Sequence, residues 1–494
     1  MGNDISENRN SAFIERGIGN SIKGLIREIQ ELYLIDEVPW VIGYSGGKDS
    51  TAVLQLTWMA IDKLPPDKRL KPIHVISTDT LVEQPVVSAW VDASHKQMEK
   101  SATDQDLPII PHKLIPDVKD RYWVNLIGKG YPAPRKLFRW CTSRMKINPS
   151  NTFIRQMVRE NGETILLLGS RKAESTRRAR TLAQHALKQI KEKLSPNAGL
   201  PNSLVYTPIE NWSNDDVWLF LMQYKNPWGF TNKSLLGMYQ GATADGECPL
   251  VIDSSTPSCG DSRFGCWVCT LVDKDRSMEA MIKNDEEKVW MSPLLELRNE
   301  LADFSEDKNR RDYRRMSGKI HLFHDSIVRG PYTKKTREYW LTRVLEIQKF
   351  IAKEGSDDFN NLELISIDDL DEIRRIWLYE KHEFDDSLPT IYENILGKKY
   401  PSIISDDNLL QNEDWHILKE ACGDDDSLFE LQTKLLDIER EYRGMSRRAG
   451  IYSALEKQLI FNQFSGEKEA IDISRKEHDR RQLAEKHPTD MKLI

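Results

Sequence analysis

Cysteines and long apolar runs are both scarce in this sequence of 494 residues. Six cysteines are far too few for a disulfide scaffold of this length. No apolar run approaches the roughly 20 residues that a transmembrane helix requires. The first ten residues include Asp4 and Glu7 and have no apolar segment, which argues against a secretory signal. We therefore expect a cytoplasmic protein in which clustered cysteines stay reduced and bind metal.

An excess of positive charge is also missing, because 70 Lys and Arg face 77 Asp and Glu, for a net charge of −7. This balance excludes a generally basic surface for nucleic acid, so any such contact requires a local patch or a partner. The best local candidate is the stretch Lys308–Arg315, which has five positive side chains and one negative side chain around Tyr313. It predicts contact with a phosphate backbone, and a solvated helix face is the alternative.

Short apolar runs alternate with helical patterns in the first half of the chain. The runs Trp40–Tyr44, Ile73–Ile76 and Thr164–Leu168 are typical of buried strands, and a helical pattern extends from Pro85 to about Met98. This alternation predicts an α/β fold in which helices cover both faces of a parallel sheet.

The composition and periodicity of the sequence change twice along the chain. Residues 245–276 are rich in Gly, Pro, Ser and Cys and have little periodicity, whereas the following residues are charged and helical in pattern, as in 339–351 and 373–379. We expect three parts: a nucleotide-binding domain over 1–244, a cysteine-rich metal element over 245–276 and a mainly helical region over 277–494.

A glycine turn follows the first predicted strand. Residues Ser45 to Ser50 read Ser-Gly-Gly-Lys-Asp-Ser, including Gly46, Gly47, Lys48 and Asp49, and a helical stretch comes next. Backbone N–H groups of such a turn converge on an anion at the start of a helix. The loop is not a Walker A motif, because Ile42 stands where its first glycine would be. The pattern predicts nucleotide phosphate binding, with a plain capped turn as the alternative.

Other candidate phosphate and ribose contacts follow the next predicted strands. Thr78 and Asp79 end the second strand, and Gly169 and Arg171 follow the strand at 164–168, with Arg177 and Arg178 a few residues later. Guanidinium groups pair with phosphate through two N–H donors, so arginines at the carboxyl end of a strand suit a polyanion. Surface charge is the alternative for each single arginine.

Four cysteines, Cys248, Cys259, Cys266 and Cys269, fall within 22 residues. Four thiolates fit either tetrahedral zinc or a [4Fe–4S] cluster, and their spacing does not separate the two. Cys141 stands apart between Arg139 and Arg144, with Lys146 nearby, and these cations are expected to lower its pKa and favour the thiolate. Cys422 is interpreted as a structural or surface thiol.

The loop resembles the PP-loop of the ATP pyrophosphatases, a superfamily that contains phosphoadenosine phosphosulfate reductases and RNA thiolases. Two further stretches resemble the reductases: Gly169–Ser175, and Thr207–Ile209 continuing through Trp212 to Asp216-Val217-Trp218. The resemblance implies an adenine nucleotide alpha hydrolase-like fold, cleavage of ATP between its α and β phosphates with Mg²⁺, and a loop that holds pyrophosphate. It places the nucleotide against Ser45–Ser50, Thr78, Asp79, Gly169, Arg171 and Arg177, with Asp49 and Arg171 in catalytic roles.

The stretch from Gly246 to Met278 is more specific and is similar to the DndC-type iron–sulfur proteins of bacterial DNA phosphorothioation. That resemblance implies replacement of a non-bridging phosphate oxygen in DNA by sulfur. The reaction would use ATP and sulfur from a cysteine desulfurase (DndA or an equivalent), with DndD and DndE as partners. The four clustered cysteines would hold the cluster and Cys141 would carry the persulfide. In the reductases two adjacent cysteines are ligands, and Trp140 occupies the first of those places here, so Cys141 as a ligand is the alternative.

Three other functions share parts of this pattern. The first is a reductase of phosphoadenosine phosphosulfate, and the second is an RNA thiolase built on the same loop. The third is a non-catalytic zinc-bearing scaffold that recruits partners to DNA.

Overall fold

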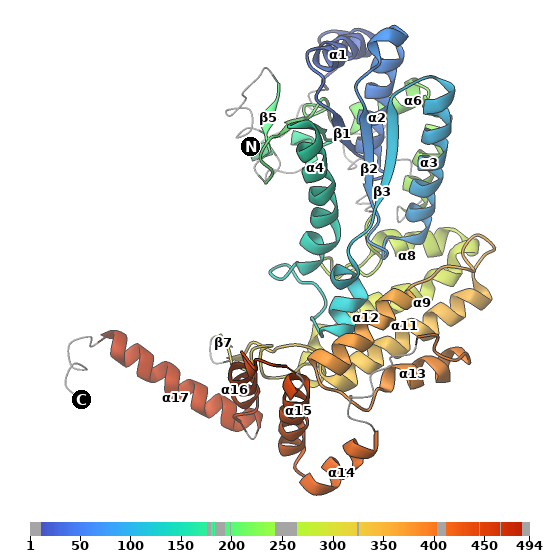
Figure 1. The fold of residues 1–494 in the computed structure, drawn as a ribbon. Helices are drawn as coiled ribbons and strands as arrows, with labels where there is room; N and C mark the ends of the chain where they lie inside the picture. Colours follow the sequence, from blue (N-terminus) through green and yellow to red (C-terminus); the bar gives the residue numbers. More distant parts are fainter. Residues whose placement is uncertain are drawn as a thin grey trace, which may run out of the picture. The chain divides into compact units, whose positions relative to one another are not determined.

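The computed structural model describes residues 11–174, 179–180, 182, 193–197, 199–242, 264–323, 326–402, 412–443, 445–464 and 466–486. The chain forms two compact units, coloured along the sequence in Figure 1. The N-terminal unit comprises Met1–Asp117 and Lys136–Arg298, and the helical unit comprises Val118–Arg135 and Asn299–Ile494. None of the described helices is long and apolar enough to cross a membrane.

A six-stranded sheet organises the N-terminal unit, in the order β3-β2-β1-β4-β6-β5. All neighbours are parallel except the short β5, which pairs antiparallel with β6. The chain runs outward from β1 to β3 and then returns to β4 on the other side of β1. This reversal creates a crevice at the carboxyl ends of β1 and β4, where open α/β sheets bind ligands. The strands are β1 (Trp40–Gly43), β2 (Ile73–Thr78), β3 (Ile109–Leu114), β4 (Thr164–Leu167), β5 (Ser195–Pro196) and β6 (Ser203–Tyr206).

Helices cover both faces of this sheet, as the sequence predicted (Figure 1). Trp40 and Ile42 of β1 point into the larger core with α1 and α2, whereas Val41 points into a smaller core with α4. The helical elements of the unit are α1 (Gly17–Leu34), α2 (Lys48–Asp62), η1 (Pro66–Lys68), α3 (Pro85–Asp104), η4 (Thr142–Ile147), α4 (Asn148–Asn161), η5 (Lys172–Glu174), α6 (Asn214–Gln223), α7 (Asn232–Gly241), α8 (Arg276–Asn284) and η6 (Glu286–Met291). Helix α9 (Ser292–Ala302) contains the boundary at residue 298.

The helical unit is built around α11, whose buried side chains include Trp340, Leu341 and Val344. Its helical elements are η2 (Val118–Asp120), η3 (Val124–Gly128), η7 (Phe304–Glu306), α10 (Asp307–Arg310), α11 (Lys334–Glu354), α12 (Ile367–Arg375), η8 (Ile376–Glu380), α13 (Ser387–Leu396), α14 (Asn412–Cys422), α15 (Asp426–Arg443), α16 (Ile451–Phe461) and α17 (Glu467–Lys486). The strands β7 (Leu322–Phe323) and β8 (Ser326–Ile327) form a small hairpin.

This division differs from the three parts that the sequence predicted. Residues Val118–Arg135 belong to the helical unit although they lie within the predicted nucleotide-binding domain. The physical reason is their apolar content, because Tyr122, Trp123, Leu126 and Ile127 are buried, and Trp123 donates a hydrogen bond to the carbonyl of Leu364. The described part of the cysteine-rich element belongs to the N-terminal unit rather than forming a part of its own.

Candidate active site

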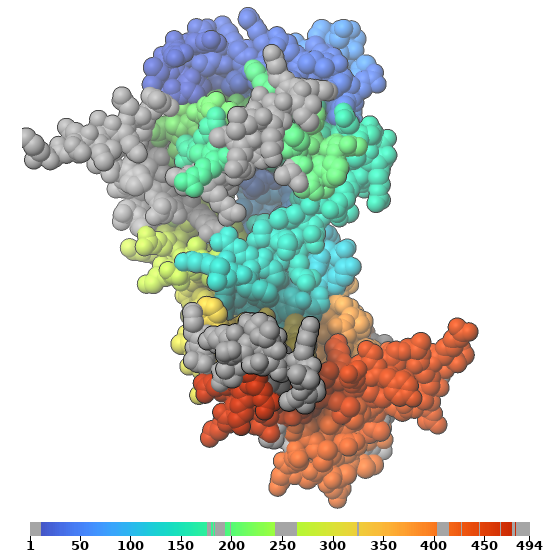
Figure 2. Space-filling view, turned by 90° about the vertical axis from the view of Figure 1, so that its left-hand side faces the viewer, coloured from blue at the N-terminus to red at the C-terminus, as the bar shows by residue number. Residues whose placement is uncertain are grey.

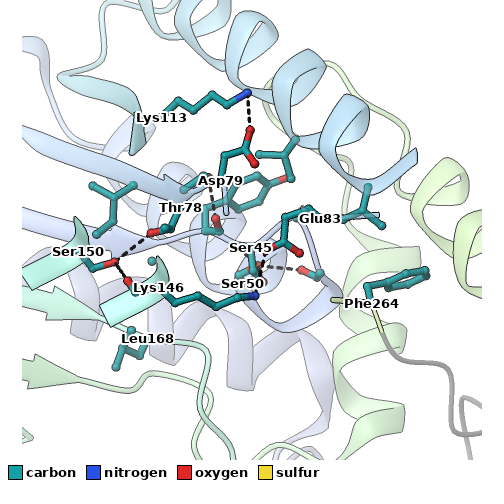
Figure 3. A pocket seen from close by; sticks show the side chains of 18 of the residues that line it. Ser45, Ser50, Thr78, Asp79, Glu83, Lys113, Lys146, Ser150, Leu168 and Phe264 are labelled. Carbon is teal, nitrogen blue, oxygen red and sulfur yellow. Dashed lines mark hydrogen bonds and ion pairs between the residues drawn. The ribbon is translucent and has the colours of Figure 1, made fainter. Parts of the chain in front are cut away.

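A cavity of about 520 Å³ opens at the carboxyl ends of the parallel strands (Figure 3). Its wall includes Gly43 at the end of β1, Thr78 at the end of β2 with Asp79 after it, Lys113 on β3 and Leu168 after β4. Figure 2 shows the surface of the N-terminal unit hollowed between its green and teal segments, with blue atoms of the first part of the chain at the bottom. The cavity therefore lies in the crevice that the strand order creates.

The predicted glycine loop forms one side of this cavity. Ser45, Gly46, Gly47, Asp49 and Ser50 all line it, and α2 begins directly after Gly47. The Ser50 hydroxyl donates to the carbonyl of Gly47 at 3.0 Å and accepts from the backbone N–H of Ser45 at 3.2 Å. The loop thus closes on itself at the start of a helix, where backbone N–H groups favour an anion.

Two glycines are required by close packing around this loop. Gly46 has φ +74°, and a Cβ there would lie 2.6 Å from Val91 Cγ2. A Cβ on Gly169 would lie 2.9 Å from the backbone carbon and oxygen of Asp49. Gly169 is not part of the cavity wall, so its contribution is to let the segment after β4 pack against the loop from behind.

Arg171 occupies a different place from the one predicted for a phosphate ligand. Its side chain is buried, its Nε donates to Asp49 Oδ1 at 2.7 Å, and its Nη1 donates to the carbonyl of Trp212 at 3.2 Å. Nη2 lies 3.5 Å from Asn214 Oδ1. These partners enclose the guanidinium outside the cavity wall, so in this structure Arg171 holds Asp49 and the loop in place, and its contact with phosphate stays a prediction.

Polar side chains that the sequence did not indicate complete the wall. Lys113 binds Asp79 Oδ2 at 2.9 Å and Asp92 Oδ1 at 2.8 Å, and these carboxylates raise the pKa of Lys113 although burial opposes them. Thr78 and Ser150 share a hydrogen bond of 3.0 Å (Figure 3). Lys113 is the next-to-last residue of strand β3, so recognising that strand would have placed it at the same edge as Asp79.

The turn from Cys266 to Cys269 packs against the segment that joins β2 to α3. Glu83 and Cys266 form an antiparallel β-bridge, and the backbone N–H of Trp267 donates to the carbonyl of Val82 at 2.9 Å. The N–H of Cys269 donates to the carbonyl of Cys266 at 3.0 Å, which closes the turn between the two thiols. Residues on both sides of the β-bridge, Glu83 and Phe264, line the cavity.

Glu83 connects the cavity to the cysteines. Its Oε1 lies 3.0 Å from Lys146 Nζ and 3.7 Å from Cys266 Sγ, and it accepts a hydrogen bond from the hydroxyl of Thr80 at 3.0 Å. Burial and the nearby Glu83 carboxylate raise the pKa of the Cys266 thiol to about 12. In the absence of a bound metal, this environment favours the protonated thiol.

Cys141 lies close enough to Cys269 for the two thiols to interact electrostatically. Burial and then this neighbour raise the pKa of Cys141, so the lowered pKa predicted from Arg139 and Arg144 is wrong for the protein without metal. Arg139 is exposed, and burial of the thiol outweighs the neighbouring charges. Cys141, which is distant in sequence from the Cys266–Cys269 turn, thus lies within electrostatic range of Cys269.

The structure describes only some of the residues that the sequence predicted as metal and nucleotide ligands. Cys248, Cys259 and Arg177 lie outside the described residues. Within the described ranges, no three His, Cys, Asp or Glu side chains stand close enough to hold a metal ion. The turn of Cys266 and Cys269 has the chemistry of half a thiolate site, and Cys141 lies within electrostatic range of Cys269.

Arg298 stabilises the turn from Cys266 to Cys269 by binding backbone carbonyls at and after its end. Its side chain is fully buried, with Nε donating to the carbonyl of Cys269 at 3.0 Å and Nη1 donating to the carbonyl of Asp273 at 2.9 Å. Nη2 donates to the carbonyl of Val272. Nothing in the sequence pattern indicated this residue, which lies 29 positions after Cys269 in a helix of ordinary composition.

The predicted basic patch Lys308–Arg315 lies in the helical unit and is largely neutralised within it. Arg311 is buried and binds Asp307 at 2.8 Å, and Arg314 binds Asp312 at 2.9 Å. Arg310 donates to the carbonyl of Glu300 at 3.0 Å. Of the five cations, Lys308 and Arg315 remain exposed, so three of the five are structural.

Comparison with protein families matches residues 39–228 to the phosphoadenosine phosphosulfate reductase domain. This stretch contains the glycine loop, the β2–α3 segment and Arg171, which are the features that shape the cavity and its surroundings. Residues 39–228 are therefore similar to a phosphoadenosine phosphosulfate reductase domain.

Individual relatives are distant. An uncharacterized protein of Methanocaldococcus jannaschii is 25% identical over 292 residues, which is 59% of this chain, and the chain spans about half (47%) of that protein's length. The phosphoadenylyl-sulfate reductase of Candida auris is 15% identical over 42% of this chain and 86% of its own, with a TM-score of 0.25. The U34-tRNA thiolase NcsA of Methanococcus maripaludis, solved with its [4Fe-4S] cluster, is 14% identical over 58% and 82%, with a TM-score of 0.28.

Proposed function

We propose that this protein is a sulfurtransferase that uses ATP to activate a DNA phosphate oxygen for replacement by sulfur. The observation that carries the proposal is Glu83, which lines the nucleotide cavity and contacts both Lys146 and Cys266. Cys266 thus lies next to a carboxylate of the cavity wall. The similarity of residues 246–278 to DndC-type proteins supports DNA as the substrate.

The cavity suits the activation half of this reaction. The loop from Ser45 to Ser50 would hold the departing pyrophosphate at the start of α2, where the developing negative charge is stabilised. Asp49 and Asp79 offer carboxylate oxygens for Mg²⁺. A non-bridging oxygen of a DNA phosphodiester attacks the α-phosphorus of ATP, and the bond to the β-phosphate breaks. The DNA phosphorus then carries AMP as a leaving group.

The sulfur half of the reaction requires a persulfide on the protein. In our proposal Cys141 receives it from a cysteine desulfurase, and its terminal sulfur attacks the activated phosphorus as AMP leaves. Because the four clustered cysteines are assigned to the cluster, an external thiol then attacks Cys141 Sγ, which forms a mixed disulfide and leaves sulfur on the DNA phosphate. An external thiol reduces that disulfide before the next cycle.

An iron–sulfur cluster fits the chemistry of the cysteines present. Cys266 and Cys269 would hold it, together with Cys248 and Cys259, and Cys141 is the alternative ligand because of its position near Cys269. When bound, a cluster supplies strongly electron-rich sulfur ligation and redox capacity beside the nucleotide. DndD and DndE are the expected partners, with DNA contact made through the assembly and the exposed Lys308 and Arg315.

The proposal is tested in a reconstituted reaction with ATP, labelled cysteine, a desulfurase, the partners and DNA. We expect pyrophosphate release and phosphorothioate formation in equal amounts. The Cys141→Ser variant should retain its iron, release pyrophosphate and transfer no sulfur, whereas the Cys422→Ser control should behave as wild type. Label found in RNA instead of DNA would replace the proposal with RNA thiolation. Loss of iron in Cys141→Ser would make Cys141 a ligand.

A further inference from the structure

A stretch of the chain without acidic residues surrounds η4, which borders the cavity of the N-terminal unit. Residues 121–159 contain nine Lys or Arg and no Asp or Glu, although the whole chain has a net charge of −7. A local excess of one charge attracts a polyanion even when the protein as a whole repels it. Which of the nine cations serve this purpose depends on their partners in the fold.

Some of these cations are already neutralised. Arg121 and Arg135 each bind an aspartate of the helical unit, and Lys146 binds Glu83 in the cavity wall. Four cations of the N-terminal unit are different, because they are exposed and make no ion pair or side-chain hydrogen bond with the residues that the structure describes: Lys136, Arg139, Arg155 and Arg159.

Helix α4 carries two of the four cations away from the cavity along one row of its surface. Asn151 lines the cavity from the first turn of α4, and Arg155 and Arg159 follow at intervals of four residues. Residues four apart are neighbours on one face of a helix, about 6 Å apart along its axis. Ile154 and Met157 are buried against the sheet, so the two arginines lie on the solvent side of α4 (labelled in Figure 1).

The turn before η4 presents the other two cations together with apolar side chains. Lys136 and Leu137 form the turn, and Phe138 and Arg139 continue the exposed segment. Leu137 is 101% exposed and Phe138 is 41% exposed. Apolar side chains between cations are the arrangement with which many proteins bind the minor groove of DNA, where cations hold phosphates and Leu or Phe enters between base pairs.

We propose that duplex DNA docks on a basic surface made of five residues: Lys136, Leu137, Arg139, Arg155 and Arg159. Its four cations bind phosphates, and Leu137 enters the minor groove. The proposal rests on the function proposed above, because it brings a DNA phosphate toward Cys141, which follows Arg139 by two residues.

Charge and spacing favour DNA as the occupant of the basic surface. The nearest acidic residue along α4 is Glu160, which accepts a hydrogen bond from Gln156 at 2.9 Å. The phosphates of DNA form a regular row of negative charges, which matches exposed cations repeated along a helix and a preceding turn. An acidic protein partner is the other occupant that this charge admits, and the experiment distinguishes the two.

The salt dependence of DNA binding tests the basic surface. Fluorescence anisotropy with a labelled duplex, without ATP, gives the binding constant of the full-length protein between about 50 and 200 mM salt. Each phosphate contact adds about 0.9 to the slope of log K against log salt, so replacing the four cations by Gln should lower the slope by about 3.6. Binding at about 50 mM salt should weaken at least 100-fold.

Matched variants identify which residues carry the effect. Arg155→Gln with Arg159→Gln should lower the slope by about 1.8. Lys23→Gln with Arg27→Gln changes an equally spaced, exposed pair on α1, outside the cavity wall, and should leave the slope unchanged. Leu137→Ser should weaken binding about fivefold at an unchanged slope, because an apolar contact releases no counterions.

Amine labelling followed by mass spectrometry locates the contact in the unmodified protein. DNA should slow the labelling of Lys136 at least tenfold and leave Lys23 unaffected. Unchanged labelling of Lys136, an unchanged slope in the variant without the four cations, or no DNA binding by the wild type at low salt would overturn the proposal. Normal DNA binding by that variant with loss of DndD or desulfurase binding would make the surface a protein interface instead.

The outcome is separable from that of the proposed function. DNA binding through the basic surface in a protein that transfers no sulfur to DNA would overturn the proposed function and leave this surface standing. Sulfur transfer to DNA at the wild-type rate by the variant without the four cations would overturn the surface and leave the function standing.

Discussion

Replacing Gly169 by alanine tests whether the segment after β4 fixes the geometry of the glycine loop. The new Cβ would lie 2.9 Å from the carbonyl carbon and oxygen of Asp49 and 3.1 Å from the N–H nitrogen of Ser50. These are backbone atoms at the start of α2, so no flexible side chain can move aside. Ordinary contact begins near 3.4 Å, and the loop must therefore shift by about 0.5 Å.

The size of the effect follows from that shift. Overpacking of this kind costs about 1–3 kcal/mol of folding free energy, which leaves most domains folded. Binding and catalytic groups need placement to within about 0.5 Å, and a displacement of about 1 Å can cost roughly 100-fold in rate. We therefore expect ATP to bind about tenfold more weakly and pyrophosphate release to slow by at least as much.

The assay compares Gly169→Ala with a matched control in the same unit. Gly237 lies in α7 beside the cavity-lining Met238, and a Cβ there would meet nothing within 4 Å. Gly237→Ala should bind ATP normally and gain up to about 1 kcal/mol of stability from helix propensity. Calorimetric ATP binding within twofold of wild type in a folded Gly169→Ala protein would refute the reasoning, because the loop would then tolerate the displacement.

Three further predictions concern stability. Arg298→Gln removes a buried charge from the carbonyls of Cys269 and Asp273, so we expect iron content to fall at least twofold and unfolding free energy to drop by about 3 kcal/mol, measured by metal analysis and urea unfolding. Burial lowers the pKa of His95 to about 4, so the unfolded chain binds more protons than the folded chain between about pH 4 and 6.5. The unfolding free energy should therefore decline by up to about 3 kcal/mol as the pH falls through that range. His95→Asn should flatten this dependence of stability on pH, measured by urea midpoints. Gly330→Ala would place a Cβ 1.7 Å from the carbonyl oxygen of Arg314, and we expect early thermal unfolding of the helical unit by calorimetry, with Gly397→Ala as a left-handed but uncrowded comparison.

The first, second and fourth strands were predictable because their runs are almost wholly apolar, with His74 as an interruption in the second, and because each pairs in the interior of the sheet. Strand β3 escaped notice because Pro111, His112 and Lys113 interrupt its apolar pattern, and β3 lies at the edge of the sheet, where burial is partial. The glycine loop was recognisable for a related reason, since its function depends on backbone geometry that glycine and serine encode locally.

Residue roles that depend on tertiary neighbours were less predictable. Arg171 follows a buried strand and has the composition of a phosphate ligand, but its partners Trp212 and Asn214 come from a distant segment. Likewise, the charges flanking Cys141 suggested a reactive thiolate, whereas burial dominates its pKa in the fold. Glu83 belongs to no recognisable sequence motif, and only its β-bridge with Cys266 shows that it lies beside the cysteines. The spacing of residues in a single sequence reveals neither how deeply a side chain is buried nor which distant residues it contacts.

The course of the chain through its two units affects how the protein can be divided. Because Val118–Arg135 belongs to the helical unit, the backbone passes from one unit to the other at three points, near residues 117, 135 and 298. A single cut at residue 298 would leave Trp123, Leu126 and Ile127 on the N-terminal fragment without the helices that bury them. A self-contained nucleotide-binding fragment therefore requires excision of Val118–Arg135 with a short linker in its place, in addition to truncation.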